Sequence, residues 1–172
     1  MKNKKLVLCG LFAAIIAVCS WITIPSAVPF TMQTFGIFSV LLILGGKYGT
    51  VAVFVYISIG AIGLPVFAGF KGGLGVILSP LGGYIIGFIA LSMIYMIITK
   101  FFGERLRSQI AGLSIGLIIC YLFGTVWYML FVGETNFAAA LTICVLPFII
   151  PDILKMVLAV MLNKRIKNRI PS

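Results

Sequence analysis

Asp152 and Lys155 are the residues of this sequence best placed to do chemistry inside a membrane. They lie in the segment Pro147–Lys155, and Asp152 is the only one of the three acidic residues embedded among apolar neighbours. A charge in hydrocarbon costs at least a few kcal/mol, so such a residue is a candidate for binding a substrate or an ion. Lys155 follows by three positions, which places both side chains on one face of a helix. The alternatives are an ion pair that only fixes a helix, or a lysine that extends to the cytosolic headgroups.

Pro147 and Pro151 predict a helix break beside this pair. Proline cannot continue a helix begun upstream, but it suits the first turn of a new one. We therefore expect a helix that ends near Leu146, a short break near Pro147–Pro151, and a second helix that starts at Pro151. Asp152 would then lie in a first turn, where free N–H groups and the helix dipole favour an anion. Breaks at membrane depth occur where the backbone is buried in protein or lines a cavity, as at transporter binding sites.

The composition places the chain in a membrane. Its 172 residues are 62% hydrophobic and 9% charged, with a mean hydropathy of +1.25. No room remains for a soluble domain, so residues 1–172 are expected to form a single transmembrane domain. The net charge of +10 lies in loops and tails beside apolar runs, which is typical of membrane topology and argues against a nucleic-acid partner.

The same composition argues against an enzyme and against a cofactor. The chain has no histidine, one embedded carboxylate and four cysteines without CxxC spacing. These residues offer neither a metal site nor the groups for acid–base or covalent catalysis. The GxxxxGK[ST] motif does not occur, so the chain is not expected to hydrolyse ATP.

The apolar runs predict an all-α integral membrane protein, a bundle of six transmembrane helices with both termini cytosolic. The run 35–62 is too long for one span, and Gly45, Gly46 and Lys47 break it in the middle, so we expect two short helices that turn at Lys47. With this division, eleven of the 13 lysine and arginine residues lie on the cytosolic side, as the positive-inside rule requires. The expected helices are 6–24, 35–45, 49–62, 84–101, 110–132 and the broken last element.

Two loops are expected to lie outside and to cover a small-molecule site. In 25–35, Thr31, Gln33 and Thr34 lie between Phe30 and Phe35, a pattern that suits a lid or an interfacial loop with aromatic anchors. In 63–83, seven of the 21 residues are glycine, which indicates a backbone that approaches something closely or re-enters the membrane.

Helix 6–24 carries a face of small residues. Ala13 and Ala17 have the small-xxx-small spacing, which permits close packing of another helix, from within the chain or from another protein.

Four segments in this order resemble the BioY family, the biotin-specific substrate-binding (S) components of energy-coupling-factor (ECF) transporters: IPSAVPFTMQTF, GLPVFAGFKGG, PLGGYIIGF and PFIIPDILK. The resemblance covers essentially the whole chain. It implies a multi-pass, bacterial-type plasma-membrane protein that captures biotin from outside. It also implies a transmembrane coupling protein and two cytosolic ATPases that energise release. The family uses the acid and lysine of the last motif, here Asp152 and Lys155, to hold the ligand's head group. The resemblance also implies that the coupling protein docks on helix 6–24 at Ala13 and Ala17.

The chemistry of biotin suits these residues. Its ring has two N–H donors and one C=O acceptor, which a carboxylate and an ammonium can bind. Lys71 is the only cation expected outside and is the candidate for the carboxylate tail. The other expected substrate-binding residues are Phe30, Thr31, Gln33, Gly69 and Tyr84, with Phe35 and Phe67 as further aromatic walls.

The sequence departs from the family pattern at Phe70, where the loop usually reads Ala-Gly-Gly, at Lys71, and at Leu81, where Thr or Ser is usual. These departures leave room for a biotin relative as the substrate. A proton-coupled carrier in which Asp152 titrates is the alternative from another class.

Overall fold

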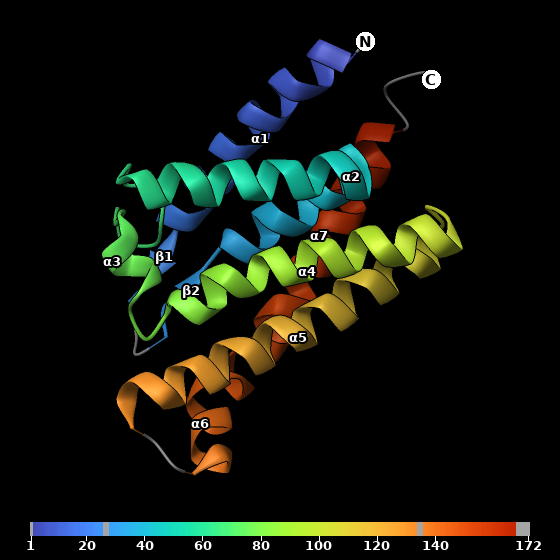
Figure 1. Ribbon diagram of the computed structural model, residues 1–172. Helices are drawn as coiled ribbons and strands as arrows, with labels where there is room; N and C mark the ends of the chain where they lie inside the picture. The colour runs from blue at the N-terminus through green and yellow to red at the C-terminus, as the bar shows by residue number, and fades with distance from the viewer. Residues whose placement is uncertain (1, 26–27, 134–135, 168–172) are drawn as a thin grey trace.

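The long apolar runs fold into helices, most of which lie side by side (Figure 1). The computed structural model describes residues 2–25, 28–133 and 136–167. Within these ranges five helices are long and apolar enough to cross a membrane, which confirms the predicted class of helical membrane protein. The helices are α1 (Lys2–Trp21), α2 (Gln33–Ile62), α3 (Leu74–Ile77), α4 (Gly82–Phe102), α5 (Leu106–Val132), α6 (Phe137–Cys144) and α7 (Leu146–Lys167).

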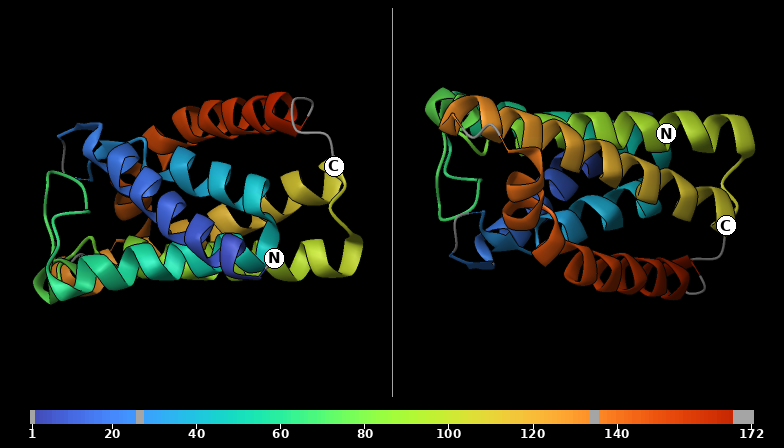
Figure 2. Two further views of the ribbon diagram at one scale, coloured as in Figure 1. Left: turned by 90° about the horizontal axis from the view of Figure 1, so that it is seen from above. Right: turned by 90° about the horizontal axis from the view of Figure 1, so that it is seen from below.

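The arrangement places α2 at the centre of the packing. α1, α4 and α7 all pack against α2, and α5 packs along α4 (Figure 2). The main core joins buried side chains from α1, α2, α4 and α5, together with Phe67 and Ala159. A smaller cluster of Val28, Cys144 and Phe148 lies beside the connecting segments.

Gly45 divides α2 into two segments that run back along each other (Figure 1). Its φ of 76° and ψ of 170° belong to a region that glycine adopts readily and other residues avoid. A Cβ at Gly49 would lie only 2.9 Å from the Leu41 Cα, which shows how closely the segments pack. The prediction of a helical hairpin is confirmed, but the chain turns at Gly45, whereas Lys47 is already helical.

The segment expected to be a loop at 25–35 contains part of a small β-hairpin. β1 (Thr23–Ile24) pairs antiparallel with β2 (Phe30–Thr31), and residues 26–27 between them lie outside the described residues. The Met32 N–H donates to the Ile22 carbonyl at 3.0 Å, and α2 begins at the next residue. The hairpin therefore holds the start of α2 against the end of α1.

The glycine-rich segment 63–83 folds back on itself and on the end of α2. A Cβ at Gly72 would lie 2.1 Å from the Leu64 carbonyl oxygen, and one at Gly82 would lie 1.6 Å from the Ile77 carbonyl oxygen. Any side chain would collide with backbone at these distances. The close approach that the glycines predicted is therefore an approach of the chain to its own backbone.

The last element is broken, as predicted, and its first helix ends close to the expected Leu146, but the second helix begins at Leu146 and not at Pro151. α6 ends at Cys144, Val145 has φ −125° and ψ −53°, and α7 continues through Pro151. Pro147 lies in the first turn, where no hydrogen bond is lost, and Pro151 deprives only the Pro147 carbonyl of its helical donor. Asp152 therefore lies beyond the first turn of α7, and its predicted place at a helix N-terminus is also wrong.

The two alanines predicted to form a docking surface are buried inside the chain. Ala13 is 2% exposed and Ala17 is 5% exposed, and both belong to the core that α1 forms with α2. A partner helix cannot reach side chains that α2 already covers, so the burial contradicts a docking surface at this pair. Gly10 and Ala14, which have the same spacing, are exposed instead.

Candidate ligand-binding site

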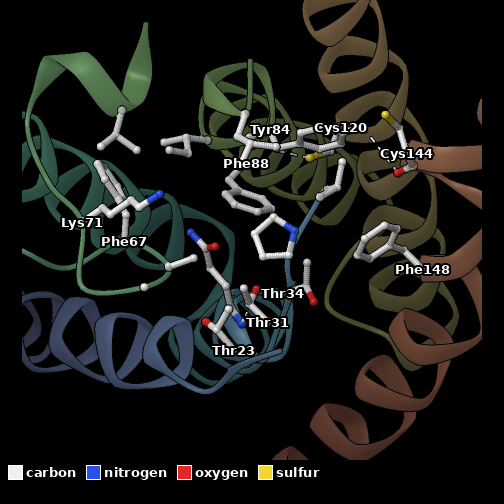
Figure 3. Close-up of a pocket in the computed structure, with 18 of the residues that line it drawn as sticks. Thr23, Thr31, Thr34, Phe67, Lys71, Tyr84, Phe88, Cys120, Cys144 and Phe148 are labelled. Atoms are coloured by element: carbon white, nitrogen blue, oxygen red, sulfur yellow. Dashed lines mark hydrogen bonds between the residues drawn. The ribbon is translucent and has the colours of Figure 1, made fainter. Parts of the chain in front are cut away.

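A cavity of about 660 Å³ lies between the β-hairpin, the glycine-rich segment and helices α2, α4, α5 and α7. Its size is that of a site for a small molecule. Figure 3 shows side chains from these separate elements converging on it, among them Thr34, Lys71, Tyr84 and Phe148.

Asp152 and Lys155 form the polar end of this cavity and both line it. The Lys155 Nζ lies 2.7 Å from the Asp152 Oδ1. Asp152 is 2% exposed and Lys155 is 9% exposed. Two charges removed from water in this way need each other and further hydrogen bonds. The burial contradicts the alternative in which Lys155 extends to the headgroups.

Two hydroxyl groups from other helices form hydrogen bonds with the ion pair. Thr34, in the first turn of α2, donates to the Asp152 Oδ1 at 2.8 Å and accepts from the Lys155 Nζ at 3.2 Å. Tyr121, on α5, donates to the Asp152 Oδ2 at 2.5 Å. Three helices therefore fix the carboxylate.

The hydrogen bonds within the protein leave some donor and acceptor positions of the ion pair for a ligand. Each carboxylate oxygen accepts about two hydrogen bonds, and an ammonium donates three. Among the described residues, the Asp152 Oδ1 accepts from Lys155 and Thr34, the Oδ2 accepts only from Tyr121, and Lys155 makes two donations. By this count, one acceptor position on the Asp152 Oδ2 and one donor on Lys155 remain among the described contacts. This combination suits a ligand edge that presents one N–H and one C=O.

Most of the predicted site residues lie at the cavity. Beyond the ion pair, it is lined by Thr31, Gln33, Gly69, Lys71 and Tyr84, and by Phe67 and Leu81. Phe30 is not among the lining residues of the described chain, and it stacks on Phe148 at 4.3 Å between ring centroids. Phe35 packs against the core instead.

Tyr84 and Gln33 use their polar atoms to hold the protein together. The Tyr84 hydroxyl lies 3.3 Å from the Thr125 Oγ1 and donates to the Cys144 carbonyl at 3.4 Å. The Gln33 amide donates to the Tyr56 hydroxyl at 2.8 Å. Tyr84 therefore offers the cavity mainly its ring.

Phe70 and Lys71 belong to a tight turn at the mouth of the cavity. The Phe67 N–H donates to the Lys71 carbonyl at 2.9 Å, and Gly69 and Phe70 between them have φ of 70° and 57°. Phe70 stacks on Trp21 at 5.0 Å between ring centroids, which compensates for a backbone conformation that suits glycine. Lys71 is exposed, and its amine is directed toward the cavity (Figure 3).

Sequence reasoning missed several residues of the site. Tyr121, Phe88 and Phe148 line the cavity, and Thr34 was noticed only as a polar residue of a loop. One signal was available, because a buried carboxylate requires donors and an apolar helix such as 110–132 contains few. The spacing of residues could not show which of its hydroxyls faces Asp152.

A helical membrane bundle that encloses a small-molecule cavity around a buried ion pair defines a class of membrane substrate-binding protein. The model of the BioY family matches residues 1–172. The biotin transporter BioY of Thermotoga maritima is 39% identical over 169 residues, covering 96% of both chains. The probable biotin transporter BioY of Pyrococcus horikoshii is 39% identical over 171 residues, covering 98% of this chain and 99% of the relative.

A solved structure has the same fold. The crystal structure of the S-component for biotin from an ECF-type ABC transporter superposes with a TM-score of 0.87 at 28% identity, covering 98% of this chain and 93% of that chain. This chain belongs to the BioY family.

Proposed function

We propose that this protein is the biotin-binding S component of an ECF transporter. The observation that supports this most directly is the buried Asp152–Lys155 pair, which lines the cavity with one acceptor position and one donor left over, in a chain of the BioY family. An N–H and the C=O of the biotin ureido ring match these two positions.

The rest of the ligand then follows the cavity toward its mouth. The apolar bicycle of biotin lies against the rings of Tyr84, Phe88 and Phe148, which line the cavity. The carboxylate tail points to the loop that carries Lys71. Thr31, Gln33 and Gly69 line the cavity as well and enclose the ligand.

The chain is proposed to be a single transmembrane domain that crosses the membrane six times with both termini cytosolic. The two segments of α2, divided at Gly45, supply two of these crossings. The β-hairpin and α3 lie at one end of the bundle, and the connection from α4 to α5 lies at the other (Figure 1). The second end carries Lys100, Arg105 and Arg107, so the positive-inside rule makes it cytosolic and places the cavity mouth outside. Arg169, also expected to be cytosolic, lies outside the described residues.

Membership of the BioY family implies that a transmembrane coupling protein and two cytosolic ATPases supply the energy for uptake. This chain has no phosphate-binding motif of its own. We assign the docking surface to the outward face of α1 around Gly10 and Ala14. Both are exposed, and a Cβ at Gly10 would meet nothing within 4 Å. Small residues at this spacing allow a partner helix to approach the backbone closely.

Equilibrium binding of biotin, desthiobiotin and lipoate to the purified protein tests the ligand assignment. Desthiobiotin keeps the ureido ring and loses the sulfur ring, whereas lipoate has a carboxylate tail and no ureido group. Biotin and desthiobiotin should bind, and lipoate should not. Lipoate binding as tight as biotin binding would show that the Asp152–Lys155 pair does not select the ligand.

Paired variants of α1 test the docking surface. Gly10→Leu with Ala14→Leu should lower biotin uptake by cells that contain the whole transporter and leave binding by the isolated protein unchanged. Ala111→Leu, an equivalent change at an exposed position of α5, is the matched control and should change neither. Ala13→Leu with Ala17→Leu should instead destabilise the isolated protein, because overpacking a core costs about 1–3 kcal/mol. Normal uptake with the first pair would contradict the assignment.

Uptake that stops with an uncoupler and persists without ATP would favour a proton-coupled carrier.

A further inference from the structure

A second, apolar groove runs along the outside of the bundle between α5 and α7, with α6 at one end. From α5 it is lined by Leu106, Ile110, Ile118 and Leu122, and from α7 by Ile153 and Val157, among others. Leu106 and Leu122 are separated by sixteen positions, which corresponds to about 24 Å along a helix, most of the thickness of the hydrocarbon core. Leu117 and Tyr121 line both this groove and the ligand cavity, so these side chains form the wall between them.

The charge of the groove is concentrated at one end. Lys164 is the one charged residue among the described residues that line it. It lies on the last turns of α7, and the first residue of α5, Leu106, lines the groove as well. Arg105 and Arg107 flank Leu106 in the sequence, and both are exposed. An apolar groove with Lys164 at one end is complementary to a molecule with an apolar chain and an anionic head.

The side chains of the groove favour a flexible occupant over a helix. Ser114 is the one small residue among its described lining residues, which include neither glycine nor alanine, and a partner helix approaches closely in a membrane where small residues line the interface. Two of the lining residues are methionines, Met156 and Met161, whose flexible side chains adapt to irregular apolar partners. An acyl chain suits such a surface better than a helix does.

We propose that the α5–α7 groove is a binding site for an anionic phospholipid of the cytosolic leaflet, with an acyl chain along the groove and the phosphate at Lys164. The choice of leaflet rests on the proposed topology, and the site itself does not depend on the ligand of the cavity. Each Lys or Arg near a membrane surface contributes about 1 kcal/mol to binding of anionic lipid, which corresponds to about fivefold in affinity.

Native mass spectrometry of the purified protein tests the headgroup. The protein is incubated with equal amounts of phosphatidylglycerol and phosphatidylcholine that carry the same acyl chains. Retention of phosphatidylglycerol should exceed that of phosphatidylcholine by at least about fivefold, and Lys164→Gln should reduce this preference by about fivefold. Arg165→Gln, at an exposed neighbour that does not line the groove, is the matched control and should keep most of the preference. Equal retention of the two lipids by the wild-type protein would overturn the proposed anionic headgroup.

A tryptophan that fills the groove tests the position of the acyl chain. Val157 is 50% exposed and lines the groove, whereas Leu158 is 51% exposed and does not. Val157→Trp should lower the retention of both lipids, and Leu158→Trp should leave it unchanged. Equal retention by the two variants would overturn the location. Displacement of phosphatidylglycerol by soluble glycerol 3-phosphate would show that the site binds a free phosphate and would overturn the proposal of a phospholipid.

Biotin binding is measured on the same samples to separate the two proposals. If biotin does not bind but the lipid pattern holds, the groove stands and the ligand assignment fails. If biotin binds normally while lipid retention is insensitive to Val157→Trp and Lys164→Gln, the ligand assignment stands and the groove proposal fails.

Discussion

The polar end of the cavity and its mouth are built in different ways. At the polar end, side chains from α2, α5 and α7 meet in a set of hydrogen bonds around Asp152. At the mouth, the turn that carries Lys71 is shaped by backbone hydrogen bonds and by positive φ angles at Gly69 and Phe70. Rigid helices suit selection of a ligand, and a loop suits its admission. From this comparison we expect that variants at the polar end change selectivity and that variants at the mouth change access.

The mouth is nevertheless anchored to the bundle through carbonyl groups. The Val66 carbonyl accepts from the Ser20 hydroxyl at 2.5 Å and from the Tyr56 hydroxyl at 3.1 Å. The Trp21 indole N–H donates to the Pro65 carbonyl at 2.8 Å. The base of the loop is therefore fixed to α1 and α2, and the turn 67–71 extends beyond these anchors.

The largest effect should come from breaking the ion pair at the polar end. Asp152→Ala leaves the Lys155 ammonium buried without its carboxylate, and removing one partner of a buried pair costs about 3–5 kcal/mol. Biotin binding should be lost as well. Thermal unfolding and equilibrium binding measure the two effects.

The double variant Asp152→Leu with Lys155→Met separates stability from binding. Apolar residues of similar volume often replace a buried ion pair at little cost, so the double variant should recover stability without recovering biotin binding. A double variant that binds biotin normally would limit the pair to a structural role and remove the proposed basis of selectivity.

The next largest effect should come from the mouth, at Gly60. A Cβ at this position would lie 2.1 Å from the Phe67 Cζ, so Gly60→Ala must displace a ring that lines the cavity. Overpacking of this kind costs about 1–3 kcal/mol. Both the thermal stability and the biotin affinity should fall. Gly75→Ala, where a Cβ would meet nothing within 4 Å, is the control in the same segment and should change the stability little.

Tyr121→Phe should have a smaller effect that is confined to the polar end. It removes the only hydrogen bond from the described residues to the Asp152 Oδ2. A hydrogen bond to a charged group contributes about 1.5–3 kcal/mol, and Tyr121 acts on the ligand through Asp152, so we expect a loss near the lower limit, about tenfold in affinity. Tyr121 is a positioning residue, and its loss should raise the dissociation rate of biotin. Tyr128→Phe on the same helix is the control. An unchanged dissociation rate in Tyr121→Phe would show that Asp152 does not need this partner.

The difference between the two ends also explains what could be predicted from the sequence. A single embedded carboxylate in an apolar chain is conspicuous, so Asp152 and Lys155 were predicted as a site. Their partners were not, because Thr34 lies 118 positions from Asp152 along the chain and no spacing rule connects separate helices. The second helix of the last element was expected to begin at Pro151 because proline usually starts a helix, whereas α7 continues through Pro151 with the loss of one hydrogen bond.

For α1, the sequence could not show which side of the helix faces the rest of the protein. Ala13 and Ala17 have the same spacing as Gly10 and Ala14, and a small-residue pattern does not state which pair faces the protein. The hairpin in α2 was predictable because length and charge distribution both required it. Its turn at Gly45 depends on one positive φ angle, which any of the nearby glycines could have supplied.

Lys71 should give the smallest effect, because it is exposed at the mouth. An exposed ion pair contributes about 0.2–1 kcal/mol, up to about fivefold in affinity. Lys71→Gln should therefore weaken biotin binding by no more than about fivefold, and the effect should shrink as salt is added. The affinity for biotinamide, in which the tail has no charge, should not change. Lys47→Gln, at an exposed cation in the turn region of α2, should leave both affinities as they are. An equal loss for biotin and biotinamide would mean that Lys71 supports the turn 67–71 and does not bind the carboxylate.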